Sequence, residues 1–193
     1  MFMLTPFCRS MFIGGIIAFI WSCFSWMVLP WHSQAYQAFE NESAVAKVIV
    51  ENVKESGIYG IPNMSNCEKP ITKEEKHAQE EAWKKGPIIF TTVNLEGVSS
   101  GMVKEILSHL ITTLIGSGII SFLLIYMAKP LEYWHKVLFV TFIGLAGAIL
   151  NQIPLWIWHS FSAGFVTLDI IDQVVAWFLA GTAMAFSLRK LKN

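Results

Sequence analysis

The stretch VLFVTFIGLAGAILNQIPLWIW, residues 137–158, decides the fold of this chain because it carries no charged side chain along its whole length. A helix of about 20 apolar residues crosses the roughly 30 Å hydrocarbon core of a bilayer. Three more apolar stretches of similar length lie on either side of it, at residues 11–31, 106–128 and 168–188. We therefore predict an all-α integral membrane protein with four transmembrane helices.

The composition supports a membrane protein and argues against nucleic-acid binding. Hydrophobic residues make up 54% of the chain and charged residues 15%, whereas charged residues form about 25% of typical soluble domains. The 14 basic and 14 acidic residues cancel, and no basic stripe alternates with aromatic side chains. The expected partners are the lipid bilayer and either another membrane protein or a second copy of the chain.

The uneven spacing of the four stretches predicts the domain organisation. Residues 1–31 form an N-terminal tail and the first span, and residues 32–105 form a small, mainly helical cap between spans one and two. Residues 106–188 contain the other three spans, and residues 189–193 form a basic tail. The first span is too long for a cleaved export signal and lacks a small-x-small cleavage site, so it is predicted to be an uncleaved signal anchor.

The positions of the basic residues predict the orientation in the membrane. Short loops that carry Lys and Arg stay in the cytoplasm, whereas loops beyond about 60 residues cross largely regardless of charge. The short loop at residues 160–167 has no basic residue. Both termini should therefore be cytoplasmic and the cap extracytoplasmic, as is typical of a bacterial inner-membrane protein. The basic residues used here are Arg9, Lys129, Lys136, Arg189, Lys190 and Lys192.

The first half of the cap has a helical pattern followed by a break. Apolar residues recur at near-helical spacing over residues 33–56, which predicts an amphipathic helix that can break near Asn41. Gly57 ends this pattern, and paired glycines with a proline predict an extended turn over residues 57–63.

The second half of the cap starts with a helix signal. Thr72 and Glu75 form a capping-box pattern, so a helix is predicted to begin there and to end before Gly86. Residues 88–95 are rich in isoleucine, valine and threonine and predict a strand.

Small residues recur every fourth position on all four spans. Such spacing permits close approach of helices in lipid, where apolar burial does not drive association. We expect one tight four-helix bundle. The stripes are Gly14, Ala18 and Ser22; Thr112 and Gly116; Gly144 and Ala148; Ala176 and Ala180; and Gly181 and Ala185.

Ionisable residues gather at the predicted outer ends of the spans. His32 follows the first span, His109 opens the second, His159 closes the third, and Asp169 and Asp172 open the fourth. Three imidazoles with a carboxylate suit zinc, copper or iron, so a metal or haem site is one hypothesis. The alternative is ordinary interfacial histidines and aspartates favoured by a helix dipole, and on this view no cofactor is expected.

Asp172 carries a separate hypothesis. If it is buried inside the fourth helix, Gln173 or His109 would be its natural partner, and the pair could serve a proton-linked transporter or channel. Near Pro154, Asn151 and Gln152 form a polar notch in the third span. Their amides either bond the carbonyls that the proline frees or contact a substrate or partner.

The chain carries few familiar catalytic signatures, which leaves an enzymatic role open and disfavoured. It lacks HExxH, P-loop and CxxC motifs, and a GxSxG spacing occurs once, at residues 97–101. Cys67, predicted to lie outside, can form an intermolecular disulfide only in an oxidising compartment. The layout of a large first outer loop and a smaller second one resembles claudin and tetraspanin topology, but the paired cysteines and the Trp-Gly-Leu-Trp signature of claudins are missing, so the resemblance implies no function.

The function predicted from these features is that of an accessory, assembly or scaffolding subunit of a larger membrane complex. A cap too small to bury its own core favours a role as an interaction surface. The metal- or haem-binding subunit and the proton-linked transporter remain the alternatives. The predicted contact residues are Trp31, His32, Tyr36, Phe39, Tyr59 and Pro62.

Overall fold

The chain divides into two compact units. The computed structural model describes residues 4–63, 72–98, 101–126 and 131–189. The first unit, here called the helical unit, comprises Met1–Tyr36, Ser100–Ile153 and Ala163–Asn193. The second, here called the hairpin unit, comprises Gln37–Ser99 and Pro154–Ser162.

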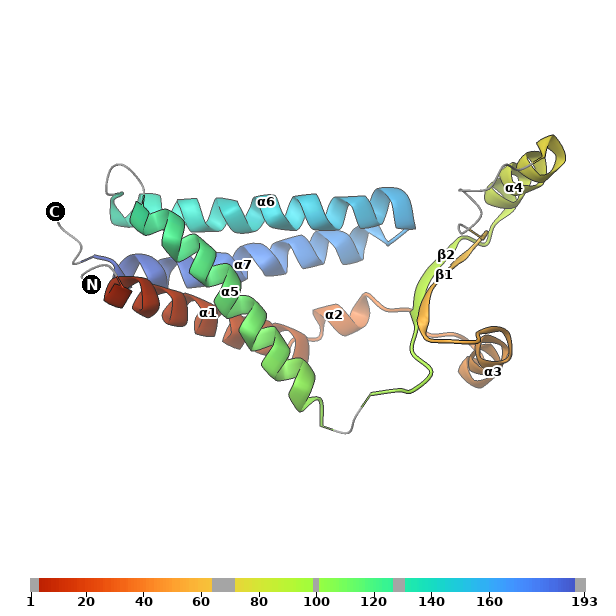
Figure 1. Cartoon of the computed structure of the whole chain (residues 1–193), viewed down its shortest axis with the longest axis horizontal. Coiled ribbons are helices and arrows are strands. Elements are labelled where there is room, and N and C mark those ends of the chain that lie inside the picture. Colours follow the sequence, from red (N-terminus) through yellow and green to blue (C-terminus); the bar gives the residue numbers. More distant parts are fainter. Residues whose placement is uncertain (1–3, 64–71, 99–100, 127–130, 190–193) are drawn as a thin grey trace. The chain divides into compact units, whose positions relative to one another are not determined.

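Four helices are long and apolar enough to cross a membrane, as the sequence predicts. They are α1 (Leu4–Met27), α5 (Val103–Tyr126), α6 (Tyr133–His159) and α7 (Ala163–Ser187), labelled in Figure 1. Helix α7 begins five residues before the predicted position 168, so the loop expected at 160–167 is shorter than predicted. The predicted end of the second span at Ala128 lies outside the described residues.

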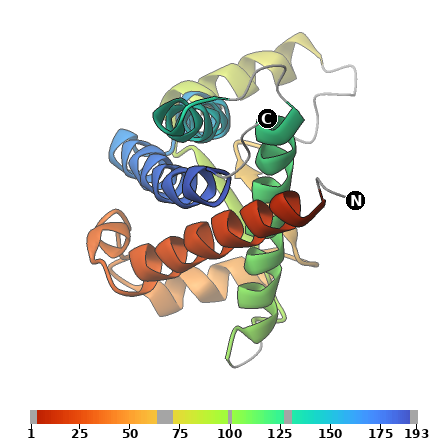
Figure 2. The same cartoon turned by 90° about the vertical axis from the view of Figure 1, so that its left-hand side faces the viewer.

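The helices of the helical unit do not all run parallel. Helix α1 packs against both α5 and α7. Figures 1 and 2 show that α5 crosses the direction of α1 and α7 steeply. The buried apolar core lies where α5, α6 and α7 meet and consists of Ile120, Leu124, Val140, Met184 and Leu188.

Small residues mark the places where these helices touch. A Cβ atom added to Gly144 of α6 would lie 2.5 Å from the Cβ of Trp177 on α7, and one added to Gly181 would lie 3.1 Å from the Cβ of Val140. Ala18, Ala180 and the other alanines of the predicted stripes on α1, α6 and α7 are buried. Close helix packing through small side chains therefore follows the predicted pattern.

The segment after α1 forms two helices. They are α2 (Trp31–Gln34) and α3 (Glu42–Asn52). The helix predicted over residues 33–56 is therefore interrupted before Glu42, as expected near Asn41, but it is shorter than predicted because residues 35–41 and 53–56 are not helical. The Asn41 side chain accepts a hydrogen bond from the backbone N–H of Ala44 and caps α3.

The next helix follows its sequence signal closely. Helix α4 (Lys73–Lys85) carries the complete capping box of Thr72 and Glu75 and stops at Gly86, whose φ is +68°. A positive φ favours glycine, which has no Cβ to clash. Both predicted ends of this helix are confirmed.

The turn predicted over residues 57–63 is wrong for its first five residues. Gly57–Ile61 forms strand β1, which pairs antiparallel with β2 (Ile89–Val93), so that Gly57 lies opposite Val93 and Ile61 opposite Ile89. The two glycines suggested a turn, but in a two-stranded sheet both strands are edges and tolerate glycine. The strand predicted at residues 88–95 is confirmed as β2.

The hairpin unit has no buried core among its described residues. Every described residue of this unit retains at least intermediate exposure to solvent, and neither α3 nor α4 has a buried residue. A two-stranded sheet without a packed apolar face is only marginally stable in water.

Candidate functional site

Helices α1, α2 and α7 bring a cluster of polar and ionisable side chains together inside the helical unit. Helix α1 ends at Met27, and the short α2 turns the chain back so that it packs against α7. This turn places His32 beside Asp172 and Asp169. All three are buried, with 2% of His32 and 4% of Asp172 exposed.

Each carboxylate oxygen of Asp172 has a polar neighbour. The indole N–H of Trp21 donates to Oδ1 at 2.7 Å, and Nε2 of His32 lies 3.4 Å from Oδ2. Asp169 lies close enough to interact electrostatically with both His32 and Asp172. The cluster thus combines two carboxyl groups with one imidazole, and Coulomb interactions are strong in such a poorly solvated place.

The imidazole of His32 is fixed by its other neighbours. Ser25 Oγ lies 3.1 Å from Nε2 and accepts a hydrogen bond of 3.0 Å from the indole N–H of Trp31. The ring of Trp26 stacks on His32, with the centroids 3.9 Å apart. The other ring nitrogen, Nδ1, is buried and has no hydrogen-bond partner in the described part of the chain. We call Trp21, Ser25, Trp31, His32, Asp169 and Asp172 the His32 cluster.

The arrangement differs from a catalytic Ser-His-Asp triad. In a triad the serine and the aspartate bind opposite ring nitrogens of the histidine. One nitrogen takes the proton of the serine, while the aspartate bonds the other nitrogen and fixes the orientation of the ring. Here both Ser25 and Asp172 approach Nε2 of His32. This geometry therefore lacks the arrangement that activates a serine nucleophile.

The structure brings together three of the five residues considered for a metal site. His109 instead pairs with Ser22 Oγ at 2.9 Å, and His159 belongs to the hairpin unit, where it stacks on Phe90 at 4.0 Å. Within residues 4–63, 72–98, 101–126 and 131–189, no three His, Cys, Asp or Glu side chains are grouped so as to hold a metal ion. Cys67 lies outside these ranges.

The partners of Asp172 also differ from the expected ones. The sequence suggested Gln173 or His109, the first adjacent in the chain and the second on α5. In the structure, Trp21 and His32 contact Asp172 instead. The reversal of the chain at α2 brings His32 to α7, and no local spacing in the sequence shows this contact.

The predicted contact residues are divided between the two units. Trp31 takes part in the His32 cluster, and Tyr36 lies against Phe165 with the ring centroids 6.0 Å apart. Phe39 is exposed, Tyr59 donates a hydrogen bond of 2.7 Å to the backbone oxygen of Glu55, and Pro62 follows β1 and is half-buried.

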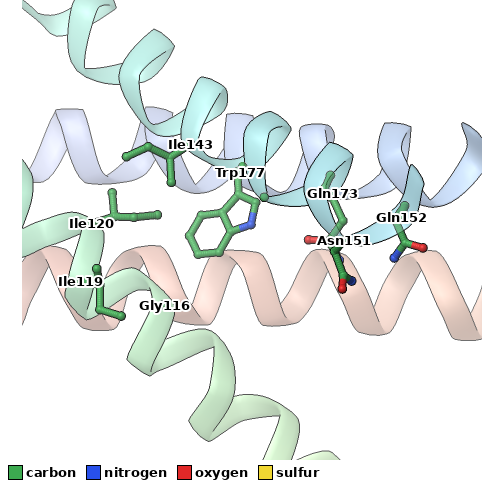
Figure 3. A pocket seen from close by; sticks show the side chains of 11 residues that line it. Gly116, Ile119, Ile120, Ile143, Asn151, Gln152, Gln173 and Trp177 are labelled. Carbon is green, nitrogen blue, oxygen red and sulfur yellow. The ribbon is translucent and has the colours of Figure 1, made fainter. Parts of the chain in front are cut away.

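The predicted polar notch lines a cavity of about 360 Å³ between α5, α6 and α7. Asn151 and Gln152 share it with Gln173 and Trp177, as Figure 3 shows. The Oε1 atom of Gln152 has no hydrogen-bond partner among the described residues.

The sequence did not point to Trp21, Ser25 or Trp177, and it suggested Gln173 only as a partner of Asp172. Trp21 and Ser25 are four positions apart on α1, as are Gln173 and Trp177 on α7. Residues at this spacing lie on one face of a helix. Side chains with polar groups, repeated every fourth residue in an apolar helix, were the sequence pattern that could have indicated these polar faces.

The comparisons with known proteins give no family. The chain matches no protein-family model, and no curated protein and no solved structure is similar enough to count as a match.

Proposed function

We propose that this chain is a small four-span membrane protein that acts as an accessory, assembly or scaffolding subunit of a larger complex, and that its extracytoplasmic hairpin unit is the docking surface. The observation that carries this proposal is the absence of a buried residue among the described residues of that unit. A fold that buries so little of its own apolar surface gains stability when a partner covers it.

Exposed and half-buried apolar residues of the hairpin unit supply a surface for such a partner. Tyr59, Ile61, Ile89 and Val93 occupy one face of the two-stranded sheet, because residues on this face alternate along each strand and lie opposite one another in register. Ile61 is 51% exposed and lies opposite the exposed Ile89. Phe39 on the preceding segment is 67% exposed.

The free edges of the sheet suit the same role. Strand β1 pairs only with β2 in the described part of the chain, so the outer edge of each strand offers backbone N–H and C=O groups. A partner can add a strand there while its side chains contact the apolar face.

The test is site-specific photocrosslinking of the full-length protein in native membranes. A photoreactive side chain at Ile89 should give one discrete crosslinked product, whereas the same group at Thr92, on the opposite face of β2, should not. Ile89→Lys should also abolish co-purification of the crosslinked protein in mild detergent, and the matched Thr92→Lys should retain it. Equal crosslinking at both positions, or a partner that survives Ile89→Lys, contradicts the proposal. Co-purification of two differently tagged copies of this chain would show that the partner is a second copy of the chain.

A second candidate, a proton-linked transporter or channel component, is favoured by the His32 cluster. Buried ionisable residues in membrane-spanning helices commonly mark ion or proton pathways, and His32, Asp169 and Asp172 are buried together. Proteoliposomes with an internal pH dye should show a proton flux that Asp172→Asn lowers at least about tenfold, while His109→Gln, which lies outside the cluster, leaves it unchanged. A flux that is equal in wild type and Asp172→Asn excludes this candidate.

A further inference from the structure

The cavity between α5, α6 and α7 has the size and lining of a site for a small lipid-soluble molecule. Its volume of about 360 Å³ falls within the range of about 300–1,000 Å³ that small-molecule sites occupy. Three isoleucines line one end and three amide side chains the other, with the indole of Trp177 between them (Figure 3). The isoleucines are Ile119, Ile120 and Ile143, and the amides are Asn151, Gln152 and Gln173.

One of the amides at this end has a buried acceptor that no described residue satisfies. Gln152 is only 8% exposed, and its Oε1 atom has no hydrogen-bond partner in the described residues. A buried acceptor without a donor is destabilising unless a bound molecule supplies the donor. A ligand hydroxyl can donate to Oε1, and each amide NH₂ group can in turn donate to an oxygen of the ligand.

The position of these amides along α6 selects an uncharged ligand. Asn151 and Gln152 precede the helix end at His159 by eight and seven residues, which corresponds to about 10–12 Å along the axis. In a spanning helix this depth lies below the head groups. Among the described residues, no charged side chain lines the cavity, so none of them compensates the charge of a phospholipid head group.

The shape of the lining favours a flat ring. The indole of Trp177 can lie against α6 because Gly144 has no Cβ, and its face offers an aromatic ring an offset-stacked contact. The isoleucines extend the site with an apolar path suited to a hydrocarbon tail.

We propose that this cavity binds the ring of a quinol-type lipid, which is an uncharged ring that carries hydroxyl groups and a hydrocarbon tail. A ring hydroxyl donates to Oε1 of Gln152, the ring lies beside Trp177, and the tail follows Ile119, Ile120 and Ile143. The proposal concerns binding alone and is independent of docking through the hairpin unit.

The test measures ligand-dependent thermal unfolding of the full-length protein in detergent, followed by circular dichroism. Decylubiquinol, kept reduced under anaerobic conditions, should raise the midpoint in a saturable manner, because a ligand that binds only the folded state stabilises it. Decylbenzene, which has a ring and tail but no hydroxyl, and dioctanoylglycerol, which has a hydroxyl but no ring, should bind at least about tenfold more weakly.

Two variants and a control locate the binding. Gly147 lines the cavity, and a Cβ added there meets no atom within 4 Å, so Gly147→Leu should fill the site without disturbing the fold and abolish the shift. Gln152→Leu should weaken decylubiquinol binding about tenfold, which corresponds to the loss of one hydrogen bond. Gly164→Leu, the same substitution at an open position outside the cavity, should bind as wild type does.

Three results overturn the proposal. The first is a shift by decylubiquinol that Gly147→Leu does not reduce. The second is equal binding of dioctanoylglycerol, which would indicate a general neutral lipid. The third is the absence of any shift while Gly147→Leu dissociates an oligomer in light scattering, which would make the cavity a helix-packing interface between copies.

Discussion

At the scale of single residues, the His32 cluster shows how one buried carboxylate is accommodated in an apolar helix. Asp172 receives the indole N–H of Trp21 on one oxygen and the imidazole of His32 on the other. Each of these groups comes from a different helix, so the hydrogen bond from Trp21 ties α1 to α7 and the close contact with His32 ties α2 to α7. Removing a hydrogen-bond donor leaves the carboxylate buried and without a partner, so its desolvation is no longer compensated. The partners of Asp172 are therefore important for the stability of the fold.

Trp21→Phe tests this dependence. The phenyl ring retains most of the apolar contacts but cannot donate to Asp172, so the free energy of unfolding should fall by about 1–3 kcal/mol. Chemical unfolding followed by circular dichroism measures the loss. Trp134→Phe, at an exposed tryptophan of α6, serves as the control and should change the free energy of unfolding by less than about 0.5 kcal/mol. Equal effects of the two substitutions would show that the hydrogen bond to Asp172 contributes nothing.

The residues of this cluster explain why the sequence predicted only part of the site. His32 and Asp172 were recognised as ionisable residues near helix ends, because their distance from the apolar segments is visible in the sequence. Their contact was not predictable, since they are separated by 140 positions and meet only because α2 reverses the chain. Trp21 lies inside the predicted first span, and only the structure shows that its indole N–H donates to Asp172.

At the scale of elements, glycines on one helix have opposite roles. Gly144 is required by packing, since a Cβ there would meet Trp177 at 2.5 Å, whereas a Cβ at Gly147 meets nothing within 4 Å. The two positions are three residues apart on α6. The sequence predicted a small-residue stripe at Gly144 and Ala148. Both Gly144 and Gly147 line the cavity, but only Gly144 is packed against a side chain of the neighbouring helix.

Gly144→Ala and Gly147→Ala form a matched pair. Overpacking against Trp177 should make Gly144→Ala destabilising by about 1–3 kcal/mol. Gly147→Ala should be neutral or stabilising by up to about 1 kcal/mol, because alanine favours the helix over glycine. Thermal unfolding of both variants in the same detergent compares them directly, and a larger loss at Gly147 would contradict the packing described for α6 and α7.

The start of α4 should depend on pH. The pKa of Glu75 is lowered from its usual value, chiefly because its carboxylate accepts a hydrogen bond from the backbone N–H of Thr72, with a further contribution from the Thr72 side chain. A depressed carboxyl pKa stabilises the folded state above the ordinary pKa, and this contribution is lost as the pH falls through the folded value.

Hydrogen exchange measures this effect in the full-length protein. Protection of the first-turn amides of α4, corrected for intrinsic exchange, should decrease between about pH 6 and about pH 3. Thr72→Ala removes the side-chain part of the capping box and should reduce the protection at the higher pH. Protection that is independent of pH in the wild type would show that the capping box does not stabilise this helix.

The elements that the sequence predicted well are those whose signals are local. The ends of α4 follow from Thr72 and Gly86, and the break before α3 follows from Asn41. Strand β1 was missed because Gly57 and Gly60 look like turn residues, while its partner β2 begins 28 residues after β1 ends. Pairing over such a distance leaves no periodic signal in the sequence.

At the scale of the whole molecule, the four apolar helices contrast with a hairpin unit in which no described residue is buried. From the spacing of the apolar stretches the sequence predicted a cap over residues 32–105, whereas the hairpin unit also contains Pro154–Ser162 and the pairing of β1 with β2 became visible only in the structure. The predicted orientation, with the hairpin unit outside and both termini inside, can be measured independently of any partner.

Cysteine labelling tests this orientation. With the three native cysteines replaced by serine, Glu80→Cys on α4 should react with a membrane-impermeant maleimide in intact spheroplasts of a bacterial host. Glu132→Cys, which lies before α6, should react only after the membrane is permeabilised, because Lys and Arg near short loops retain them in the cytoplasm. The reverse pattern would invert the orientation and place the hairpin unit in the cytoplasm.

The antiparallel register of the hairpin has an engineering consequence. Ile61, at the end of β1, lies opposite Ile89, at the start of β2. Residues 62–88, which include α4, therefore connect two neighbouring strand ends. Loop-closure entropy changes slowly with length, so the chain can accept a different insert there, such as a short turn or a reporter domain, while β1 and β2 keep their register. This site offers a way to attach a fluorescent label to the protein without altering its apolar helices.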